Sequence, residues 1–246
     1  MAKHNDKQQR LVNDAAKSLL ANIRFMSIDN PIRSIVITST IPNEGKSFVA
    51  INLAQAIAGK PCLIVEADLR KRTLAAAMGI HPEHGIYTVL SGSDLKDVAV
   101  ATPQRNLYFL DAEPQIPNPP DLLSSRRYNR FLETAVNSFD YVVIDTPPVG
   151  TFVDAAVIAN HADATFLVVR ENFTKKELVK SAYDQLEKAG ANVAGVVMNA
   201  CDMGSDDYYG YYSYYSYYDE DGGKGKNRSG TQHVETIRES AGSMEA

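Results

Sequence analysis

The 246-residue sequence is poor in the features that mark secreted and membrane-spanning proteins. Its two cysteines, Cys62 and Cys201, are too few for a disulfide framework and favour a reducing compartment. No window approaches the roughly 18 consecutive apolar residues of a membrane span, and the polar opening residues lack the apolar core of a signal peptide. We therefore expect a cytoplasmic chain that is peripheral to the inner face of a membrane only through a partner.

Positive charge is also scarce. The chain has 25 Lys and Arg residues against 30 Asp and Glu residues, a formal net charge of -5. Binding the phosphate backbone of a nucleic acid calls for a basic surface, so we expect no nucleic-acid partner. Apolar residues make up 44% of the chain, which suits one globular domain with extensions.

Hydrophobic periodicity predicts an α/β domain. Apolar residues at helical spacing predict a helix over about residues 8–27, and short apolar runs then alternate with helical segments. This alternation is typical of a doubly wound, mostly parallel sheet with helices on both faces. We expect strands near residues 33–40, 61–68, 106–111, 140–148, 162–170 and 191–200.

Three helices are expected between these strands. They cover residues 47–59, closed by Gly59, residues 119–139, opened by prolines, and residues 174–190, with Thr174 as N-cap and Gly190 past the end. The periodicity stops near Met203. The expected organisation is an N-terminal helix and lead-in (1–30), a P-loop domain (31–203), a tyrosine-rich cluster (204–221) and a disordered polar tail (222–246).

The loop after the first strand has the form of a phosphate-binding P-loop. In such a loop backbone N–H groups cradle phosphates, the lysine contacts them and the hydroxyl residue binds Mg²⁺. The strict pattern would have glycine at Thr40, but the loop follows a strand, opens a helix and carries Asn43, which tolerates positive φ. The predicted nucleotide-binding residues are Pro42, Asn43, Glu44, Gly45, Lys46, Ser47 and Phe48.

Acidic residues end two further strands. Glu66, Asp68 and Arg70 alternate after one apolar run, and Asp145 follows another. Parallel strands place their carboxyl ends at one edge, where open α/β sheets bind ligands. Each feature is common by itself, but together they predict a Mg²⁺-dependent nucleotide site. We assign Lys46, Glu66, Asp68 and Asp145 catalytic roles, with Ser47, Asp68 and Asp145 as metal ligands.

These motifs, with the segments IPNPPDLLSSRRY and DTPPVGTFVDA, resemble the bacterial tyrosine kinases that regulate capsule and exopolysaccharide synthesis. The resemblance runs over most of residues 10–203 and into the tyrosine cluster. It implies an ATP site built from the P-loop, a D-x-D-x-R motif and a D-T-P-P strand end. Accordingly, Lys46 and Ser47 would bind phosphate and Mg²⁺, Asp145 would position the metal, and Arg70 and Asn199 would join the nucleotide-binding set.

The sequence departs from the family pattern at three places. Glu66 stands where the family has aspartate, the residue implicated as base toward the incoming tyrosine. Asn43 replaces a P-loop glycine. The assembly motif E-x-x-R-x-x-R, which the family uses to form a ring, is replaced by Asp14, Lys17 and Leu20, so a ring is not assumed.

Eight of the thirteen tyrosines lie within eleven residues near the end of the chain. The resemblance implies that they accept phosphate from ATP, between subunits in this family, with Glu66 or Asp68 taking the hydroxyl proton. It also implies a membrane adaptor as activator, and we further expect a phosphotyrosine phosphatase as partner and a possible homo-oligomer. The predicted acceptors are Tyr208, Tyr209, Tyr211, Tyr212, Tyr214, Tyr215, Tyr217 and Tyr218.

Two other interpretations stay open. An ATPase switch of the partitioning and cell-division type would share the fold, but those proteins carry an early P-loop lysine where this chain has Ile41. Alternatively, the tyrosine cluster could act mainly in self-association. The sequence leaves undecided the external substrates, the polysaccharide, the choice between transfer within and between subunits, the activity of a site with Glu66, and the need for an activator.

Overall fold

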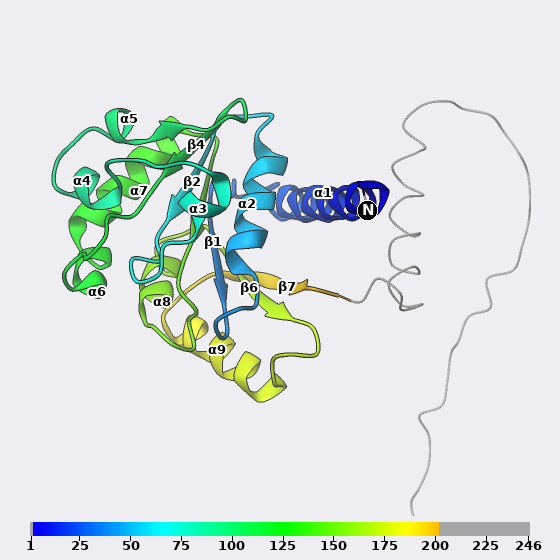
Figure 1. Cartoon of the computed structure of the whole chain (residues 1–246). Helices are drawn as coiled ribbons and strands as arrows, with labels where there is room; N and C mark the ends of the chain where they lie inside the picture. Colours follow the sequence, from blue (N-terminus) through cyan, green and yellow to red (C-terminus); the bar gives the residue numbers. More distant parts are fainter. Residues whose placement is uncertain (1, 202–246) are drawn as a thin grey trace, which may run out of the picture. The chain divides into compact units, whose positions relative to one another are not determined.

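The computed structural model describes residues 2–201, and these form a sheet covered by helices on both faces (Figure 1). Within this part of the chain the sheet has seven strands in the order β3-β4-β2-β5-β1-β6-β7. Every neighbouring pair is parallel except β3 and β4. The strands are β1 Ser34–Ser39, β2 Cys62–Glu66, β3 Val100–Ala101, β4 Leu107–Leu110, β5 Tyr141–Asp145, β6 Ala164–Arg170 and β7 Val193–Asn199.

The helices divide between the two faces of the sheet. Residues of α1, α2 and α3 pack into one apolar cluster, and residues of α4 to α9 pack into the other. The doubly wound fold expected from the sequence is thereby confirmed. The helices are α1 Ala2–Met26, α2 Lys46–Ile57, α3 Leu74–Met78, α4 Ile86–Leu90, α5 Leu95–Val98, α6 Pro119–Leu123, α7 Arg126–Ser138, α8 Asp154–Ala159 and α9 Lys176–Lys188.

Parallel pairing brings the functional strand ends together. Asp145, the last residue of β5, is in register with Ile37 of β1 on one side and with Glu66 of β2 on the other. Both β1 and β2 run directly into loops at this edge, the P-loop and residues 67–73. The carboxyl edge of the sheet therefore brings together Ile37, Glu66 and Asp145, which are separated by about 30 and about 80 residues in the sequence. The pattern of strands predicts this gathering.

Three local predictions differ from the structure. The N-terminal helix, expected from about residue 8, begins at Ala2. The segment opened by prolines forms two helices, because Ser125 begins α7 as an N-cap whose hydroxyl accepts from the amide of Tyr128 at 3.3 Å. The N-cap of α9 is Lys175, and Thr174 turns its hydroxyl to the carboxylate of Glu44 instead. Gly190 ends this helix at φ 79°, as expected.

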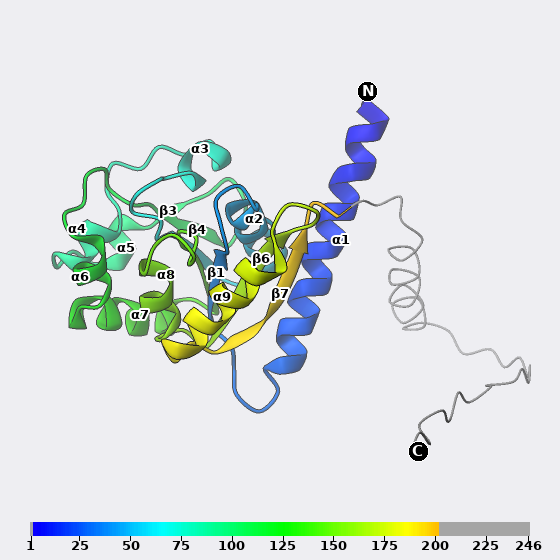
Figure 2. The same ribbon diagram turned by 90° about the horizontal axis from the view of Figure 1, so that it is seen from below.

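The long helix α1 is held to the domain through its C-terminal half. Leu20 and Ile23 are buried against α2 and the sheet, and Figure 2 shows the N-terminal turns continuing beyond the sheet. Of the three assembly-motif positions, Asp14 and Lys17 form an exposed pair at 4.0 Å, whereas Leu20 belongs to the core.

The tyrosine cluster and polar tail predicted for residues 204–246 lie outside the described residues, so those two predictions stay predictions. Over residues 2–201, none of the helices combines the length and apolar character needed to cross a bilayer.

The packing of α1 can be tested by truncating its buried contact. Replacing the fully buried Ile23 with alanine should lower the free energy of unfolding by about 2–5 kcal/mol, since it removes apolar contacts and leaves a cavity. Phe25→Ala is the matched control, because that side chain is 72% exposed and should change stability by about 0.5 kcal/mol or less. Urea denaturation measures both, and equal small losses would contradict the packed position of α1.

Candidate active site

The P-loop, residues 40–47, turns sharply between β1 and α2. Asn43 adopts φ 69°, which confirms that asparagine takes the left-handed conformation here, and Gly45 adopts φ 91°. A Cβ on Gly45 would also lie 2.0 Å from Nδ2 of Asn199, so the position has no room for a side chain. Successive backbone amides in such a turn, followed by a helix N-terminus, suit the binding of phosphate.

Lys46 lies at the centre of a polar cluster at this edge. Its Nζ is 3.3 Å from Oδ2 of Asp68, 3.4 Å from Oδ2 of Asp145 and 3.2 Å from Oγ of Ser47. The hydroxyl of Ser47 donates to Oδ2 of Asp145 at 2.5 Å and lies 3.0 Å from the hydroxyl of Thr73. The structure therefore brings together four predicted site residues from the starts of α2, the β2 loop and the end of β5.

Glu66 is adjacent to this cluster but is engaged differently. It is fully buried, and one carboxylate oxygen accepts from the amides of Thr73 and Leu74 at 2.7 and 2.9 Å. The other oxygen accepts from the amide of Asp68 at 3.3 Å. Glu66 thus ties both ends of the loop 67–73 to the end of β2, and it sets where Asp68 lies.

The cluster places three carboxyl groups around one ammonium. Burial, followed by the charge of Asp145, raises the pKa of Glu66 to about 8. Burial, partly offset by Lys46, raises the pKa of Asp145 to about 6. Burial alone would lower the pKa of Lys46, but the neighbouring carboxylates outweigh it and raise that pKa instead. The site therefore holds more carboxyl groups than cations.

This excess of carboxyl groups fits a divalent cation. Ser47 and Asp145 supply a hydroxyl and a carboxylate in direct contact, and Asp68 is nearby, an oxygen donor set of the kind that Mg²⁺ takes. Within residues 2–201 there is no group of three His, Cys, Asp or Glu side chains arranged to hold a metal by themselves. Mg²⁺ commonly uses one or two protein ligands and completes its shell with substrate phosphates and water.

Glu44 braces the P-loop by linking it to the end of β6 and to Thr174. This buried carboxylate accepts from the amide of Ile41 at 2.7 Å, from the amide of Arg170 at 3.4 Å and from the hydroxyl of Thr174. The side chain of Asn199 donates to the backbone carbonyl of Glu44 at 2.8 Å. Sequence reasoning placed Glu44 and Asn199 among nucleotide ligands and missed Thr174, which it assigned to a helix cap.

The remaining predicted residues lie at the margin of the cluster. Arg70 bonds to Asp154 at 2.7 Å, and its guanidinium covers the ring of Phe152 at 4.3 Å. Pro42 is exposed, and Phe48 is 50% exposed on the first turn of α2. Asp154 was missed by sequence reasoning, and the segment DTPPVGTFVDA that contains it was its only signal.

The first strand of the parallel sheet leads through a Gly-Lys-Ser turn into a helix, and acids end the neighbouring strands. These features define a P-loop nucleotide-binding protein. No family model matches the chain. Among curated proteins, the tyrosine-protein kinase YwqD of Bacillus subtilis is 35% identical over 203 residues, which cover 81% of this chain and 86% of the relative. This chain belongs to the bacterial tyrosine kinase family.

Solved structures agree with this assignment. The kinase domain of the Escherichia coli tyrosine kinase ETK superposes with a TM-score of 0.74 at 29% identity, over 78% of this chain and 77% of that one. The cell-division ATPase MinD of Pyrococcus furiosus gives a TM-score of 0.60 at 24% identity, over 71% of this chain and 74% of that one. The second likeness shows a shared fold.

The brace behind the P-loop generates a testable prediction. Glu44→Ala leaves the amide of Ile41 and the hydroxyl of Thr174 without their acceptor, which should cost about 1–3 kcal/mol of stability. Loss of the preformed loop should also weaken nucleotide binding by roughly tenfold. Urea denaturation and titration with a fluorescent nucleotide measure the two effects. Glu177→Ala, an exposed glutamate on α9, is the control, and unchanged affinity in the Glu44 variant would contradict the brace.

The pKa of Glu66 generates a second prediction, on stability against pH. Its folded-state pKa of about 8 exceeds the ordinary value of 4.5, so the folded protein holds a proton that the unfolded chain releases in this window. The contribution of Glu66 to stability is therefore present below pH 4.5 and falls as pH rises toward 8. Without Mg²⁺ or nucleotide, the stability of wild type relative to Glu66→Gln should decline from pH 5 to 8 in urea denaturation. A difference that grows with pH would refute the assignment.

Proposed function

We propose that this chain transfers the γ-phosphoryl group of ATP to tyrosine hydroxyls, including those of its own C-terminal cluster. The observation that carries the proposal is the contact of Lys46 with Asp68 and Asp145 beside the P-loop. At one edge of the sheet, this arrangement offers a cation that can bind phosphate. It also offers carboxylates that can bind a metal ion and accept a proton. The eight clustered tyrosines of the same chain supply acceptors.

Lys46 is proposed to exchange partners when nucleotide binds. In the described structure its ammonium is held by two carboxylates, so it stays charged and points into the site. Phosphate oxygens on the P-loop would compete for the same ammonium. Mg²⁺, held by Ser47 and Asp145 with Asp68 nearby, would neutralise charge on the transferring phosphoryl group.

The hydroxyl proton is proposed to pass to Asp68 and not to Glu66. Both oxygens of Glu66 already accept from backbone amides, whereas Oδ2 of Asp68 faces Lys46 in the cluster. The bond from the γ-phosphorus to the ADP oxygen breaks, a bond to the tyrosine oxygen forms, and the proton of the hydroxyl moves to the Asp68 carboxylate. Glu66 is then a positioning residue that holds the loop 67–73.

The cellular role is proposed from family likeness. Relatives include tyrosine-protein kinases of the name CpsD in streptococci, and the sequence resembles kinases of capsule and exopolysaccharide synthesis. We place this chain in such a pathway, bound at the membrane through an adaptor that activates it and opposed by a phosphotyrosine phosphatase. A homo-oligomer would let one subunit modify another, but the buried Leu20 gives no support to assembly through the ring motif.

The ATPase-switch interpretation keeps one observation in its favour, the fold shared with MinD. It differs from the kinase proposal in where the phosphate goes. A switch would release phosphate to water and leave the tyrosines unmodified.

The kinase proposal predicts that tail phosphorylation depends on Lys46. Wild type incubated with ATP and Mg²⁺ should acquire phosphate on residues 208–218, and Lys46→Met should acquire none, because it lacks the ammonium in the site. Mass spectrometry of preparations free of other kinases measures this. Equal modification of both chains would defeat the kinase proposal, and hydrolysis of ATP without phosphotyrosine would favour the switch.

A mixing experiment separates transfer within a subunit from transfer between subunits. A full-length chain with all eight cluster tyrosines changed to phenylalanine serves as enzyme, and full-length Lys46→Met serves as substrate. Phosphate on the Lys46→Met chain is expected if subunits modify one another. If the Lys46→Met chain stays unmodified while wild-type chain incubated under the same conditions is phosphorylated, transfer occurs within one subunit.

A further inference from the structure

The loop that follows β2 carries three consecutive cations, Arg70, Lys71 and Arg72, of which the first and last are already paired. Arg70 binds the buried Asp154. Arg72 bonds through two of its nitrogens to the buried Asp111. Both guanidinium groups therefore serve the fold, and each neutralises a carboxylate that could not stay buried alone.

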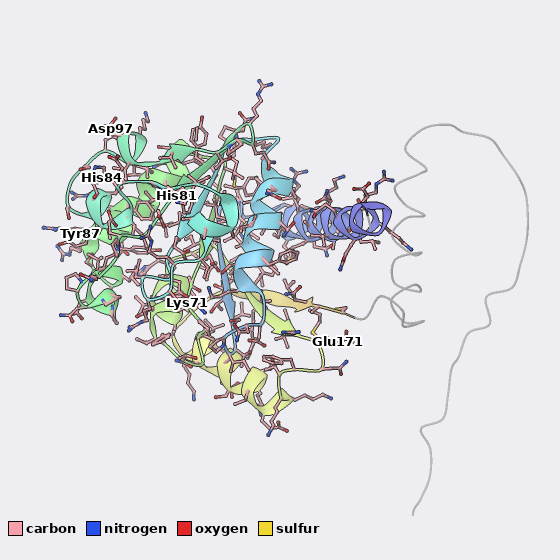
Figure 3. All side chains as sticks on the ribbon, viewed as in Figure 1. Lys71, His81, His84, Tyr87, Asp97 and Glu171 are labelled. Atoms are coloured by element: carbon pink, nitrogen blue, oxygen red, sulfur yellow. The ribbon has the colours of Figure 1, made fainter. Side chains whose placement is uncertain are left out.

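Lys71 differs from its neighbours. Its side chain is exposed, and across the described stretch 2–201 no carboxylate lies within ion-pair distance of its ammonium. Its backbone is nevertheless fixed, because its amide donates to Oδ1 of Asp68 at 2.9 Å. The other oxygen of Asp68 is 3.3 Å from Lys46. Figure 3 labels Lys71 on this loop between β2 and α3.

The surroundings of the reaction centre are otherwise acidic. Four aspartates, Asp68, Asp145, Asp111 and Asp154, pair with three cations, Lys46, Arg70 and Arg72, and bound ATP would add more negative charge. An acidic peptide entering such a site is repelled unless an unpaired cation meets it. Arg170, at the end of β6, stacks its guanidinium on the ring of Phe173 at 5.0 Å, whereas Lys71 is attached directly to the Asp68 turn.

The tyrosine cluster is acidic at both ends and neutral in the middle. Asp206 and Asp207 precede it, and Asp219, Glu220 and Asp221 follow it. Four outer tyrosines, Tyr208, Tyr209, Tyr217 and Tyr218, therefore lie within two residues of an acid. The four inner ones, Tyr211, Tyr212, Tyr214 and Tyr215, lie four or five residues from the nearest acid.

We propose that Lys71 binds the acidic residues that flank the outer tyrosines of segment 205–221, and so directs phosphorylation to the ends of the cluster. The inference rests on the proposed kinase function, and it says which of the eight tyrosines are phosphorylated faster. In an extended peptide an acid two residues from the acceptor lies about 7 Å away, whereas one four or five residues away lies at about 13–18 Å. The backbone of Lys71 is bonded to Asp68, so its exposed side chain starts next to the reaction centre and is proposed to reach the nearer acid.

The test uses two full-length reporter chains, each with one cluster tyrosine kept and the other seven changed to phenylalanine. One keeps Tyr209, an outer position, and the other keeps Tyr214, an inner one. Initial rates of phosphorylation are measured by quantitative mass spectrometry in wild-type and Lys71→Glu backgrounds. The ratio of the Tyr209 rate to the Tyr214 rate should fall roughly two- to fivefold in Lys71→Glu, the effect of losing one exposed ion pair.

Two further variants separate the contact from general charge effects. Lys60→Glu makes the same change at an exposed lysine beyond α2, before the amino end of β2, and should leave the ratio unchanged. Changing Asp206 and Asp207 to asparagine in the Tyr209 reporter should lower its phosphorylation rate as Lys71→Glu does. A reporter that carries both these changes and Lys71→Glu should show no further loss of rate.

The outcomes distinguish this inference from the function on which it rests. A ratio unchanged in Lys71→Glu, an equal fall at both reporters, or the same change in Lys60→Glu would overturn the role of Lys71 while leaving the kinase proposal intact. Tail phosphorylation that persists in Lys46→Met defeats the kinase proposal itself, whatever the ratio.

Discussion

The approach of one ammonium to three buried carboxyl groups is the constraint on which this site depends. Parallel register puts Asp145 beside Glu66, and the P-loop brings Lys46 between them and Asp68. Burying that many acids with one cation raises the pKa of Glu66 and Asp145, so the fold holds a charge imbalance in place. A divalent cation bound beside Asp145 and Ser47 would supply the positive charge that this cluster lacks.

Two glutamates hold the loops that carry these groups. Glu66 accepts from amides at both ends of the loop 67–73. Glu44 accepts from the amide of Ile41 in the P-loop and from the amide of Arg170 at the end of β6. In both cases a carboxylate meets backbone donors, so it fixes the main chain while other residues face the substrate. The extra methylene of Glu66 suits this role, since a longer side chain reaches from the end of β2 to the amides of Thr73 and Leu74.

Much of this arrangement could be predicted from the sequence because it follows from local patterns. The apolar runs predicted six of the seven strands, and the Gly-Lys-Ser turn with Asn43 predicted the P-loop and its left-handed residue. The two-residue strand β3 and the short helices α3, α4, α5 and α8 carry too few residues for a periodic signal. The pairs of Arg70 with Asp154 and Glu44 with Thr174 join segments 84 and 130 residues apart, and only the packed fold brings them together.

The last strand, β7, precedes the proposed acceptor segment in the sequence. Asn199 ends β7 and donates to the P-loop carbonyl of Glu44, so the chain leaves the sheet at the nucleotide edge. About twelve residues separate this point from the middle of the tyrosine cluster, a contour of up to about 40 Å. Under the proposed function, chain length alone does not distinguish the eight tyrosines. A preference among them would then come from contacts next to the reacting hydroxyl, because the ends of the cluster carry acids and its middle does not.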